Sequence, residues 1–277
     1  MLSRELIISV TFGYLILLFA IAWYTERKGS PLKKWANHPW VYALSLAVYC
    51  SAWTFYGSVG RAAENGLDFL AIYVGPCLVA PLWWLVMRKI IRISKAMNIS
   101  SIADFISSRY GKSANLGALV TIFCLFGILP YISIQIKGIS SSLDILHLTE
   151  TSMTAGTFSV FSDSGFYLAL GLALFTIFFG TRAIEATARH EGLVMAVVFE
   201  SIFKLFAFLA IGIFVSFFLF DGLTDIFAQA KQADLSHLFV LSEENGVSDW
   251  FWMGLLSMMA VMFLPRQFQM GIIENTS

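Results

Sequence analysis

Long apolar runs recur along the whole chain, and no other feature of the sequence constrains its fold as much. A helix needs roughly 20 residues to cross the ~30 Å hydrocarbon core of a bilayer. Seven runs are close to that length or exceed it, at residues 5–25, 41–61, 68–88, 114–137, 164–182, 191–220 and 249–265. The sequence therefore predicts an all-α polytopic membrane protein with about seven transmembrane helices.

The composition agrees with this fold class. Hydrophobic residues make up 58% of the chain and charged residues 13%, whereas a soluble domain is nearer half apolar and about a quarter charged. The formal net charge is zero, so nothing indicates an affinity for nucleic acid. Thr25-Glu26-Arg27-Lys28 follows the first run where a signal peptide would have a small-residue cleavage site, so this run is a retained span.

The basic residues predict the direction in which the chain crosses the membrane. With the N-terminus outside, cytoplasmic segments carry thirteen of the 18 Lys and Arg residues, and outside segments carry four. The cytoplasmic ones are Arg27, Lys28, Lys33, Lys34, Arg88, Lys89, Arg92, Lys95, Arg109, Lys112, Arg182, Arg189 and Arg266. Cytoplasmic loops of membrane proteins are enriched in Lys and Arg. We therefore expect a multi-pass membrane protein with its N-terminus outside and residue 277 in the cytoplasm.

One shorter segment has the pattern of a surface helix. Residues 99–110 alternate apolar positions with Asp104 and Arg109, which is typical of an amphipathic helix at the membrane surface. Ser100 or Ser101 would cap its N-terminus. The two long outside loops, at residues 138–163 and 221–248, have room for a further short helix each.

Signatures of soluble enzymes are absent from the sequence: there is no phosphate-binding glycine loop, nucleophile elbow or His/Cys metal cluster. Cys50, Cys77 and Cys124 lie inside apolar runs, which is typical of buried small hydrophobes. We expect neither enzymatic activity nor a metal or organic cofactor within these residues.

The second run has the most unusual composition. Between Tyr49 and Gly60 it contains Ser51, Thr54, Gly57 and Ser58. Small and hydroxylated residues let a helix break and expose carbonyl oxygens to an ion, and they also let intact helices pack closely. The composition alone supports both interpretations equally.

Two pairs of polar residues lie four positions apart inside predicted spans. Tyr131 and Gln135 share one face of the fourth span, next to a proline, so they suit either a solute cavity or an interhelical hydrogen bond. Glu200 and Lys204 in the sixth span have the spacing and order of a helical ion pair. Charged residues at bilayer depth also line transport pathways, so a pathway role is the alternative.

The seventh run ends at Pro265, which breaks a helix or marks the edge of the membrane. We expect Arg266 and Gln267, directly after it, to face the cytoplasmic side.

Taken together, these segments resemble the sodium/solute symporter family. The resemblance is carried by the small-residue second span, the Ser-Ile-Ala-Asp-Phe…Arg-Tyr-Gly string of residues 101–111, the region from Gly180 through Ala196 to Glu200, and the proline in the seventh span. Residues 50–60, 189–192 and 265–275 are most similar to the symporter-like N-terminal membrane domains of bacterial sensor histidine kinases.

The resemblance implies a protein of the bacterial inner membrane. It also implies a fold of about thirteen spans, with one extra N-terminal helix before two inverted five-helix repeats. Residues 1–277 would then be a partial domain, an N-terminal fragment that holds the extra helix, the whole first repeat and the start of the second. A solute and a sodium ion would bind beside the broken first helix of each repeat.

Mapped onto this sequence, the resemblance implies a set of site residues. The backbone at Ala47 and Cys50 would bind the ion, with Na⁺ as the coupling ion. The solute would bind at Ser51, Trp53, Tyr131 and Gln135. Glu200 and Lys204 would line the pathway.

The sequence departs from the family at three positions. An acidic residue that serves sodium binding in the second span of proline symporters corresponds here to Tyr49, which leaves sodium dependence open. Aromatic residues that precede the proline of the seventh span correspond to Ser257 and Val261. Proline itself is therefore not the expected solute.

Three functions follow from these patterns. The first is a symporter-like domain that transports or senses a small polar solute, such as an amino acid or a carboxylate, and is coupled to a downstream histidine kinase and its cytoplasmic response regulator. The second is a free-standing secondary symporter. The third is a non-transporting membrane sensor or scaffold that lost ion coupling, which the Tyr49 departure motivates.

Overall fold

The computed structural model describes residues 4–27, 29–147, 164–175, 191–241 and 246–274, and every element in these ranges is helical. In chain order the elements are α1 (Arg4–Glu26), α2 (Pro31–Trp35), α3 (Pro39–Ser45), η1 (Leu46–Tyr49), α4 (Ala52–Asn65), η2 (Gly66–Leu70), α5 (Ala71–Leu82), η3 (Trp83–Met87), α6 (Arg88–Met97), α7 (Ile102–Arg109), α8 (Ala114–His147), α9 (Ser164–Phe175), α10 (Glu191–Phe214), η6 (Val215–Leu219), α11 (Leu223–Gln232), η7 (Ser236–Phe239), α12 (Gly246–Phe263), α13 (Pro265–Phe268) and η8 (Gln269–Ile273).

Within these ranges, four helical stretches are long and apolar enough to cross a membrane, and a bent pair makes a fifth. The four are Glu5–Glu26, Ala52–Met97, Ala114–Ser142 and Glu191–Leu219, and the bent pair is Val247–Phe263 with Pro265–Ile273. The prediction of an all-α membrane protein is therefore confirmed. The number of seven spans and the inverted repeat stay predictions.

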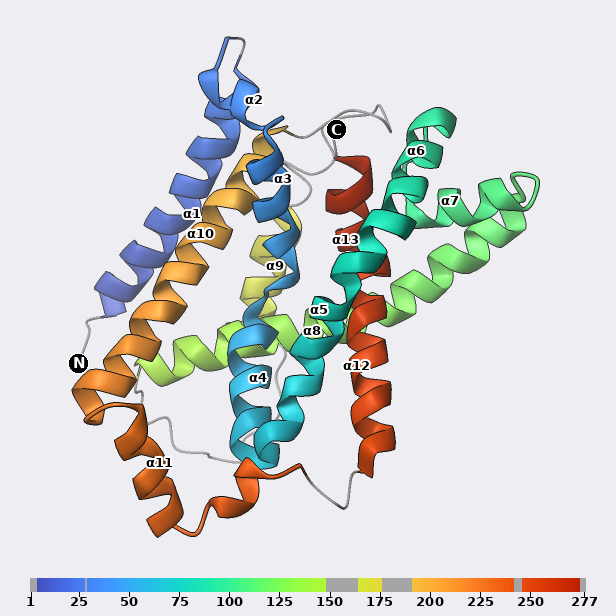
Figure 1. Cartoon of the computed structure of the whole chain (residues 1–277). Coiled ribbons are helices and arrows are strands. Elements are labelled where there is room, and N and C mark those ends of the chain that lie inside the picture. The colour runs from blue at the N-terminus through green and yellow to red at the C-terminus, as the bar shows by residue number, and fades with distance from the viewer. Residues whose placement is uncertain (1–3, 28, 148–163, 176–190, 242–245, 275–277) are drawn as a thin grey trace, which may run out of the picture.

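Two of the predicted spans differ from the observed helices for physical reasons. The predicted span 41–61 is divided into α3–η1 and α4, which are separated by two extended residues. The predicted span 68–88 corresponds to α5–η3. The chain reverses its direction at Gly66 without a longer loop, so α4 and α5–η3 form one continuous helical stretch (Figure 1). Gly66 has a φ of 56°, and a Cβ there would lie 2.0 Å from the Leu238 carbonyl oxygen, so only glycine fits this turn. Of the predicted span 164–182, residues 176–182 lie outside the described part.

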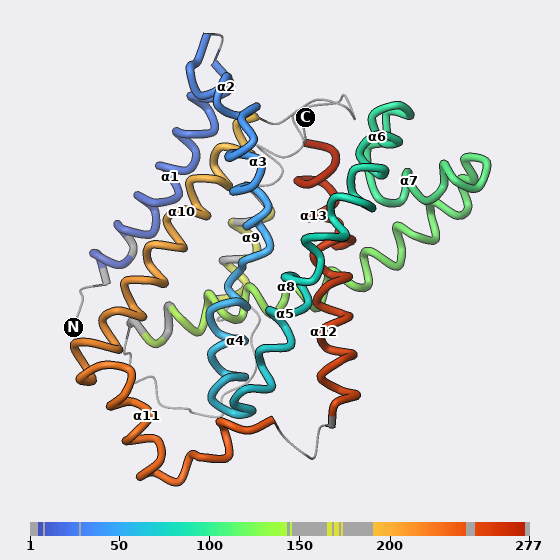
Figure 2. Tube along the Cα trace, viewed as in Figure 1, coloured from blue at the N-terminus to red at the C-terminus, as the bar shows by residue number. Residues whose placement is uncertain are grey.

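Helices that are distant in sequence lie side by side (Figure 2). α1 packs along α10, α12 packs along α5, and α8 runs across behind α4 (Figure 1). Small residues permit the closest of these contacts. A Cβ on Gly75 of α5 would lie 2.2 Å from the Gly254 carbonyl oxygen of α12, and a Cβ on Gly192 of α10 would lie 2.6 Å from the Ala22 carbonyl oxygen of α1. This is the small-residue packing expected of membrane helices.

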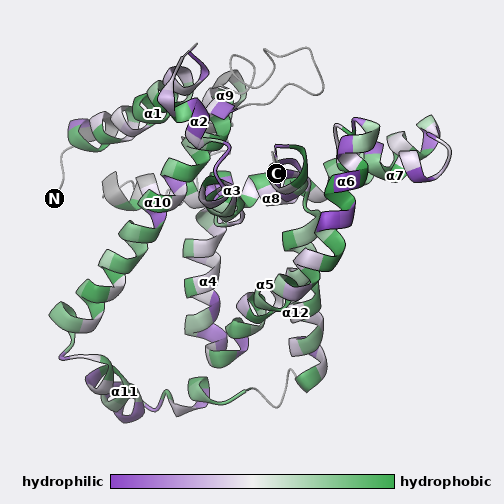
Figure 3. Ribbon diagram, turned by 45° about the horizontal axis from the view of Figure 1, so that its top comes forward, coloured by the Kyte–Doolittle hydropathy of each residue, from purple (hydrophilic) through white to green (hydrophobic). Residues whose placement is uncertain are grey.

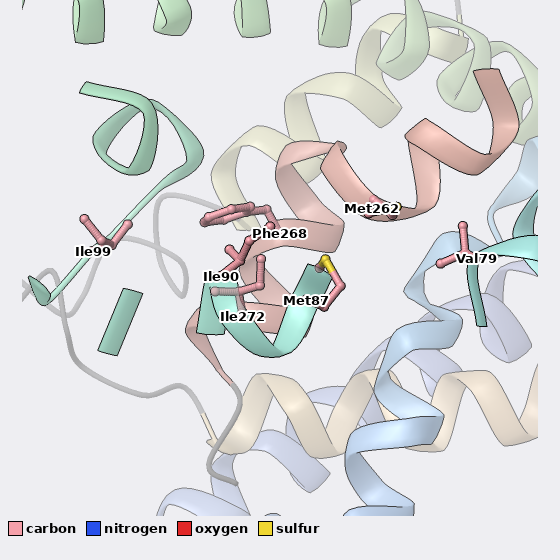
Figure 4. Close-up of a cluster of buried hydrophobic side chains, with 7 residues drawn as sticks. All are labelled: Val79, Met87, Ile90, Ile99, Met262, Phe268 and Ile272. Carbon is pink, nitrogen blue, oxygen red and sulfur yellow. The ribbon is translucent and has the colours of Figure 1, made fainter. Parts of the chain in front are cut away.

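The largest apolar core surrounds the bend between α12 and α13 (Figure 4). It combines residues of α5, η3, α6, α12, α13 and η8 with Ile99: Val79, Met87, Ile90, Ile99, Met262, Phe268 and Ile272. A second cluster, Val41, Val194, Val198 and Met270, joins α3 and α10 to η8. The bend is thus fixed on both sides by buried side chains.

Apolar and polar segments are separated along the molecule. Apolar residues cover α10 and α12, whereas hydrophilic residues gather on α2, α6 and α11 (Figure 3). α2 and the C-terminal end of α6 lie at one end of the molecule, and α11 and the turn between α4 and α5 lie at the opposite end (Figure 1). The basic residues of α2 and α6 therefore share one end. Which end faces the cytoplasm stays a prediction.

The predicted short helices form in two places. α7 covers Ile102–Arg109, and the Ser101 hydroxyl accepts a hydrogen bond from the Asp104 N–H at 3.1 Å, which confirms the predicted cap. The Asp104 carboxylate accepts in turn from the Ser100 N–H at 3.1 Å. The segment 221–248, predicted as an outside loop, contains the short helix α11, whereas residues 148–163 of the other predicted loop lie beyond the described part.

Candidate functional site

The helix of the second predicted span breaks between η1 and α4. Cys50 (φ −74°, ψ 114°) and Ser51 (φ −126°, ψ −174°) both have extended backbone. A break of this kind removes the next-turn donors of several carbonyl groups, which then need other partners. The Ala47 carbonyl accepts from the Cys50 N–H at 2.9 Å, and the Ser51 N–H donates to the Thr54 hydroxyl at 3.1 Å. We call residues 46–51 the first break.

A second break separates α12 from α13. Leu264 is extended (φ −57°, ψ 136°), and the helices on its two sides are bent by 46°. The residue before a proline is driven towards extended backbone, and Pro265 then starts α13 at a position where its missing N–H costs nothing. The proline therefore breaks the helix, which was one of the two predicted outcomes.

The two breaks contact each other through side chains. The Arg266 guanidinium donates to the Tyr49 carbonyl oxygen at 2.9 Å, and the Gln267 amide donates to the Leu46 carbonyl oxygen at 3.2 Å. Gln267 is only 1% exposed. The bend at Leu264 turns α13 towards the first break, and the prediction that these two residues face the cytoplasmic side stays a prediction.

Lys204 reaches the first break from α10. Its ammonium donates to the Cys50 carbonyl oxygen at 3.0 Å and forms an ion pair with Glu200 at 2.5 Å. The ion pair that the spacing predicted therefore forms. The contact with Cys50 is additional, and it places the charged pair at the break.

α8 contributes Gln135 and Tyr131 to the same region. The Gln135 side-chain oxygen accepts a hydrogen bond from the backbone N–H of Trp53, in the first turn of α4, at 3.2 Å. The Tyr131 ring lies 4.7 Å from the guanidinium of Arg266, which is a cation–π distance. The shared face that the spacing predicted for Tyr131 and Gln135 thus meets the start of α4, next to the first break, and the second break.

Several buried polar atoms at these breaks have no hydrogen-bond partner among the described residues. They are the Tyr131 hydroxyl, Gln135 Nε2, Arg266 Nε and Gln267 Oε1. An unpaired buried polar group costs roughly 1–3 kcal/mol, so a native structure rarely gathers several of them in one place without a partner. The group offers three donors and one acceptor to a polar ligand.

A cavity of about 360 Å³ lies beside this group, between α7, α8 and the second break. Most of its walls are apolar, including Ile106, Phe123 and Leu264, and its polar side chains are those of Tyr131 and Arg266. Apolar pockets of a few hundred Å³ with a few converging polar groups are typical of small-molecule sites.

The remaining predicted site residues occupy different places. Ser51 lies in the first break, and the Trp53 ring covers Gly57, whose Cβ would lie 2.5 Å from Trp53 Nε1. Ser257 turns away towards α5 and donates to the Gly254 carbonyl oxygen at 3.0 Å. Val261 packs against the apolar core. Gly180, Arg189 and His190, which carried part of the resemblance, lie outside the described residues.

Sequence reasoning missed two members of this site, Arg266 and Gln267. The available signal was their position directly after a proline inside an apolar run. A bend there returns the next residues towards the protein interior, where polar side chains need partners.

Comparison with known proteins gives one distant match. A protein of Bacillus subtilis (strain 168) described as the uncharacterized symporter YhjB is 22% identical to this chain over 249 residues. The match covers 87% of this chain and 47% of that protein, so the chain spans about half the length of the relative. No family model and no solved structure matches. The apolar helices support a membrane protein, and the match shows a distant similarity to a protein described as a symporter.

Proposed function

We propose that this chain provides the solute-binding part of a symporter-like membrane protein that transports or senses a small polar solute. The observation that carries the proposal is the group of unpaired buried donors, from Tyr131, Gln135 and Arg266, between two broken helices and beside a cavity. Broken helices at a central site are how many secondary transporters bind their solutes. The similarity to a symporter supports the same function class.

The charges favour a solute with a carboxylate. Arg266 and Lys204 bring two positive charges to the breaks, and Glu200 brings one negative charge. Three side chains from other elements, those of Lys204, Arg266 and Gln267, donate through nitrogen to carbonyl oxygens of the first break. An amino acid or a short carboxylic acid would complement the remaining positive charge and the free N–H groups.

The arrangement supports a simple mechanism. α13 and α10 both hold the first break through side chains, so a solute that binds there touches parts of the chain that are distant in sequence. Solute binding would change how these parts pack, and rocking of one part against the other would expose the site alternately to the two sides of the membrane.

Coupling to a histidine kinase is a further part of the proposal, supported by the resemblance of residues 50–60 and 265–275 to the membrane domains of sensor kinases. In that case rocking of the membrane domain would be transmitted to the cytoplasm, and a response regulator would be the partner. A free-standing symporter and a non-transporting sensor are the alternatives. Autophosphorylation of the full-length protein in membrane vesicles, with and without added solute, would distinguish a kinase-coupled domain from a free-standing symporter and from a non-transporting sensor without a kinase.

Uptake by the full-length protein in lipid vesicles tests the proposal. We expect at least one radiolabelled solute from a panel of amino acids and short-chain carboxylates to accumulate, and unlabelled solute to compete with it. Binding without accumulation under any ion gradient would favour the non-transporting sensor. Neither binding nor uptake across the panel would contradict the proposal.

Tyr131→Phe tests the site itself. The Tyr131 hydroxyl bonds to nothing among the described residues, so its removal costs the fold no hydrogen bond. If the hydroxyl binds solute, the Kd should rise about fivefold, the value of one net hydrogen bond of ~1 kcal/mol. Tyr24→Phe is the matched control, because Tyr24 is an exposed residue of α1. Equal affinities of the two variants and the wild type would place the solute elsewhere.

A further inference from the structure

We infer that the ammonium group of Lys204 takes the place of a coupling cation at the first break, so that solute binds without sodium. The inference rests on the proposed function, which it deepens by naming the cation. The relevant atoms are the carbonyl oxygens of the first break, which have lost the N–H partners of an intact helix.

The first step is the occupancy of these oxygens. The carbonyl groups of Leu46, Tyr49 and Cys50 accept hydrogen bonds from Gln267, Arg266 and Lys204, at 3.2, 2.9 and 3.0 Å. The Ala47 carbonyl accepts from a backbone N–H. Four oxygens of the break are therefore already bonded to donors of the protein. A hard cation such as Na⁺ would have to displace these donors to collect oxygen ligands.

The second step is electrostatic. Two of the donors, the Lys204 ammonium and the Arg266 guanidinium, carry a full positive charge. Two like charges about 4 Å apart in partly buried surroundings repel strongly enough to weaken binding about a thousandfold. A sodium ion at the Cys50 oxygen would meet this repulsion from Lys204. The break itself, Leu-Ala-Val-Tyr-Cys-Ser, has no carboxylate, and the Glu200 carboxylate, which offsets part of this repulsion, is paired with Lys204.

The third step is the role of Glu200. Its carboxylate pairs with Lys204 one helical turn away, at 2.5 Å. This pairing gives the ammonium a counter-charge at bilayer depth, where an isolated charge is costly. The pair thus presents a cation on a flexible four-carbon stem to a carbonyl group of the break. The covalently attached ammonium supplies the positive charge that a free cation would supply in an ion-coupled site, and it cannot dissociate from the protein.

Cys50 provides a direct readout, because its thiol is free and exposed beside the oxygen in question. In full-length protein with Cys77 and Cys124 replaced by alanine, the rate of Cys50 alkylation by N-ethylmaleimide would be measured in sodium chloride and in choline chloride at equal ionic strength. We expect the two rates to agree in the background with Lys204 intact. In Lys204→Met we expect sodium to slow alkylation severalfold, because the vacated oxygen becomes available to the ion.

Lys137→Met is the matched control, since Lys137 is an exposed lysine of another membrane helix, and it should show no sodium effect. A saturable sodium effect with Lys204 intact would overturn the inference, and so would a Lys204→Met variant that stays indifferent to sodium. If Lys204→Met does not fold, Lys204→Arg replaces it, and a sodium effect in that variant would contradict the inference. These rates need no solute, so their outcome is independent of the uptake result that tests the proposed function.

Discussion

At the scale of single residues, the site depends on side chains that bond to backbone atoms of another element. Gln267 shows this most clearly, because it is 1% exposed and donates to the Leu46 carbonyl oxygen at 3.2 Å. Bonds of this type satisfy carbonyl groups that the first break leaves without a helical partner.

Gln267→Leu should therefore destabilise the protein while keeping the volume of the side chain similar. The Leu46 carbonyl would lose the amide that bonds to it, at a cost of about 1–3 kcal/mol. The thermal unfolding temperature of the detergent-solubilised protein should fall by several degrees. Gln229→Leu on α11, an exposed position, should leave it nearly unchanged. Equal unfolding temperatures of the two variants would show that the contact contributes nothing to stability.

Gly75 is a second residue at which a single added carbon atom would disturb helix packing. Its added Cβ would lie 2.0 Å from the Ser257 hydroxyl and 2.2 Å from the Gly254 carbonyl oxygen. Gly75→Ala should force α5 and α12 apart and cost about 1–3 kcal/mol, as other overpacked contacts do. Gly212→Ala on α10, where a Cβ would meet nothing within 4 Å, should be neutral or slightly stabilising. Urea or thermal unfolding of both variants would test the contrast, and an equally stable Gly75→Ala variant would contradict the close packing.

At the scale of elements, the caps and breaks follow from local chemistry. The Ser101 hydroxyl caps α7 through the Asp104 N–H. Ser101→Ala should cost about 1 kcal/mol of local helix stability and raise amide hydrogen exchange in residues 102–109. Ser108→Ala, whose hydroxyl donates only within the same helix at 2.7 Å, should change exchange little. Unchanged exchange in Ser101→Ala would mean that packing on α8 alone holds α7.

Local patterns predicted the elements better than their contacts. The small residues after Tyr49 left a broken and an intact helix equally open, whereas Ser100 or Ser101 was predicted to cap α7 and the Glu200–Lys204 spacing predicted the ion pair. Each of these signals acts over at most four residues. The contacts of Arg266 with Tyr49, and of Lys204 with Cys50, join residues 217 and 154 positions apart, and no local pattern encodes such pairings.

At the scale of the whole molecule, the apolar helices indicate that the protein lies in a membrane, and the basic residues predict the direction in which the chain crosses it. α2 and the end of α6 lie at one end of the molecule, and α11 lies at the other (Figure 1). This is the arrangement that alternating spans require if the basic end faces the cytoplasm.

Cysteine labelling in intact cells would test this direction. In a background without Cys50, Cys77 and Cys124, Arg92→Cys on α6 should resist a membrane-impermeant maleimide, whereas Lys231→Cys on α11 should react with it. Both positions are exposed, so burial does not explain a difference. Both should react after the cells are permeabilised. Labelling of Arg92→Cys from outside, with protection of Lys231→Cys, would reverse the topology.

The way in which the two breaks are joined has a consequence for the energy of motion. Tyr49 and Leu46 are held to α13 by a guanidinium and an amide, while apolar packing lies around them. If water enters when these parts separate, it can hydrate the same carbonyl and nitrogen atoms, so the bonds are exchanged and no void forms. The contact between the first break and α13 can therefore open and close repeatedly at a small net cost in free energy. This property suits a protein that alternates between two conformations.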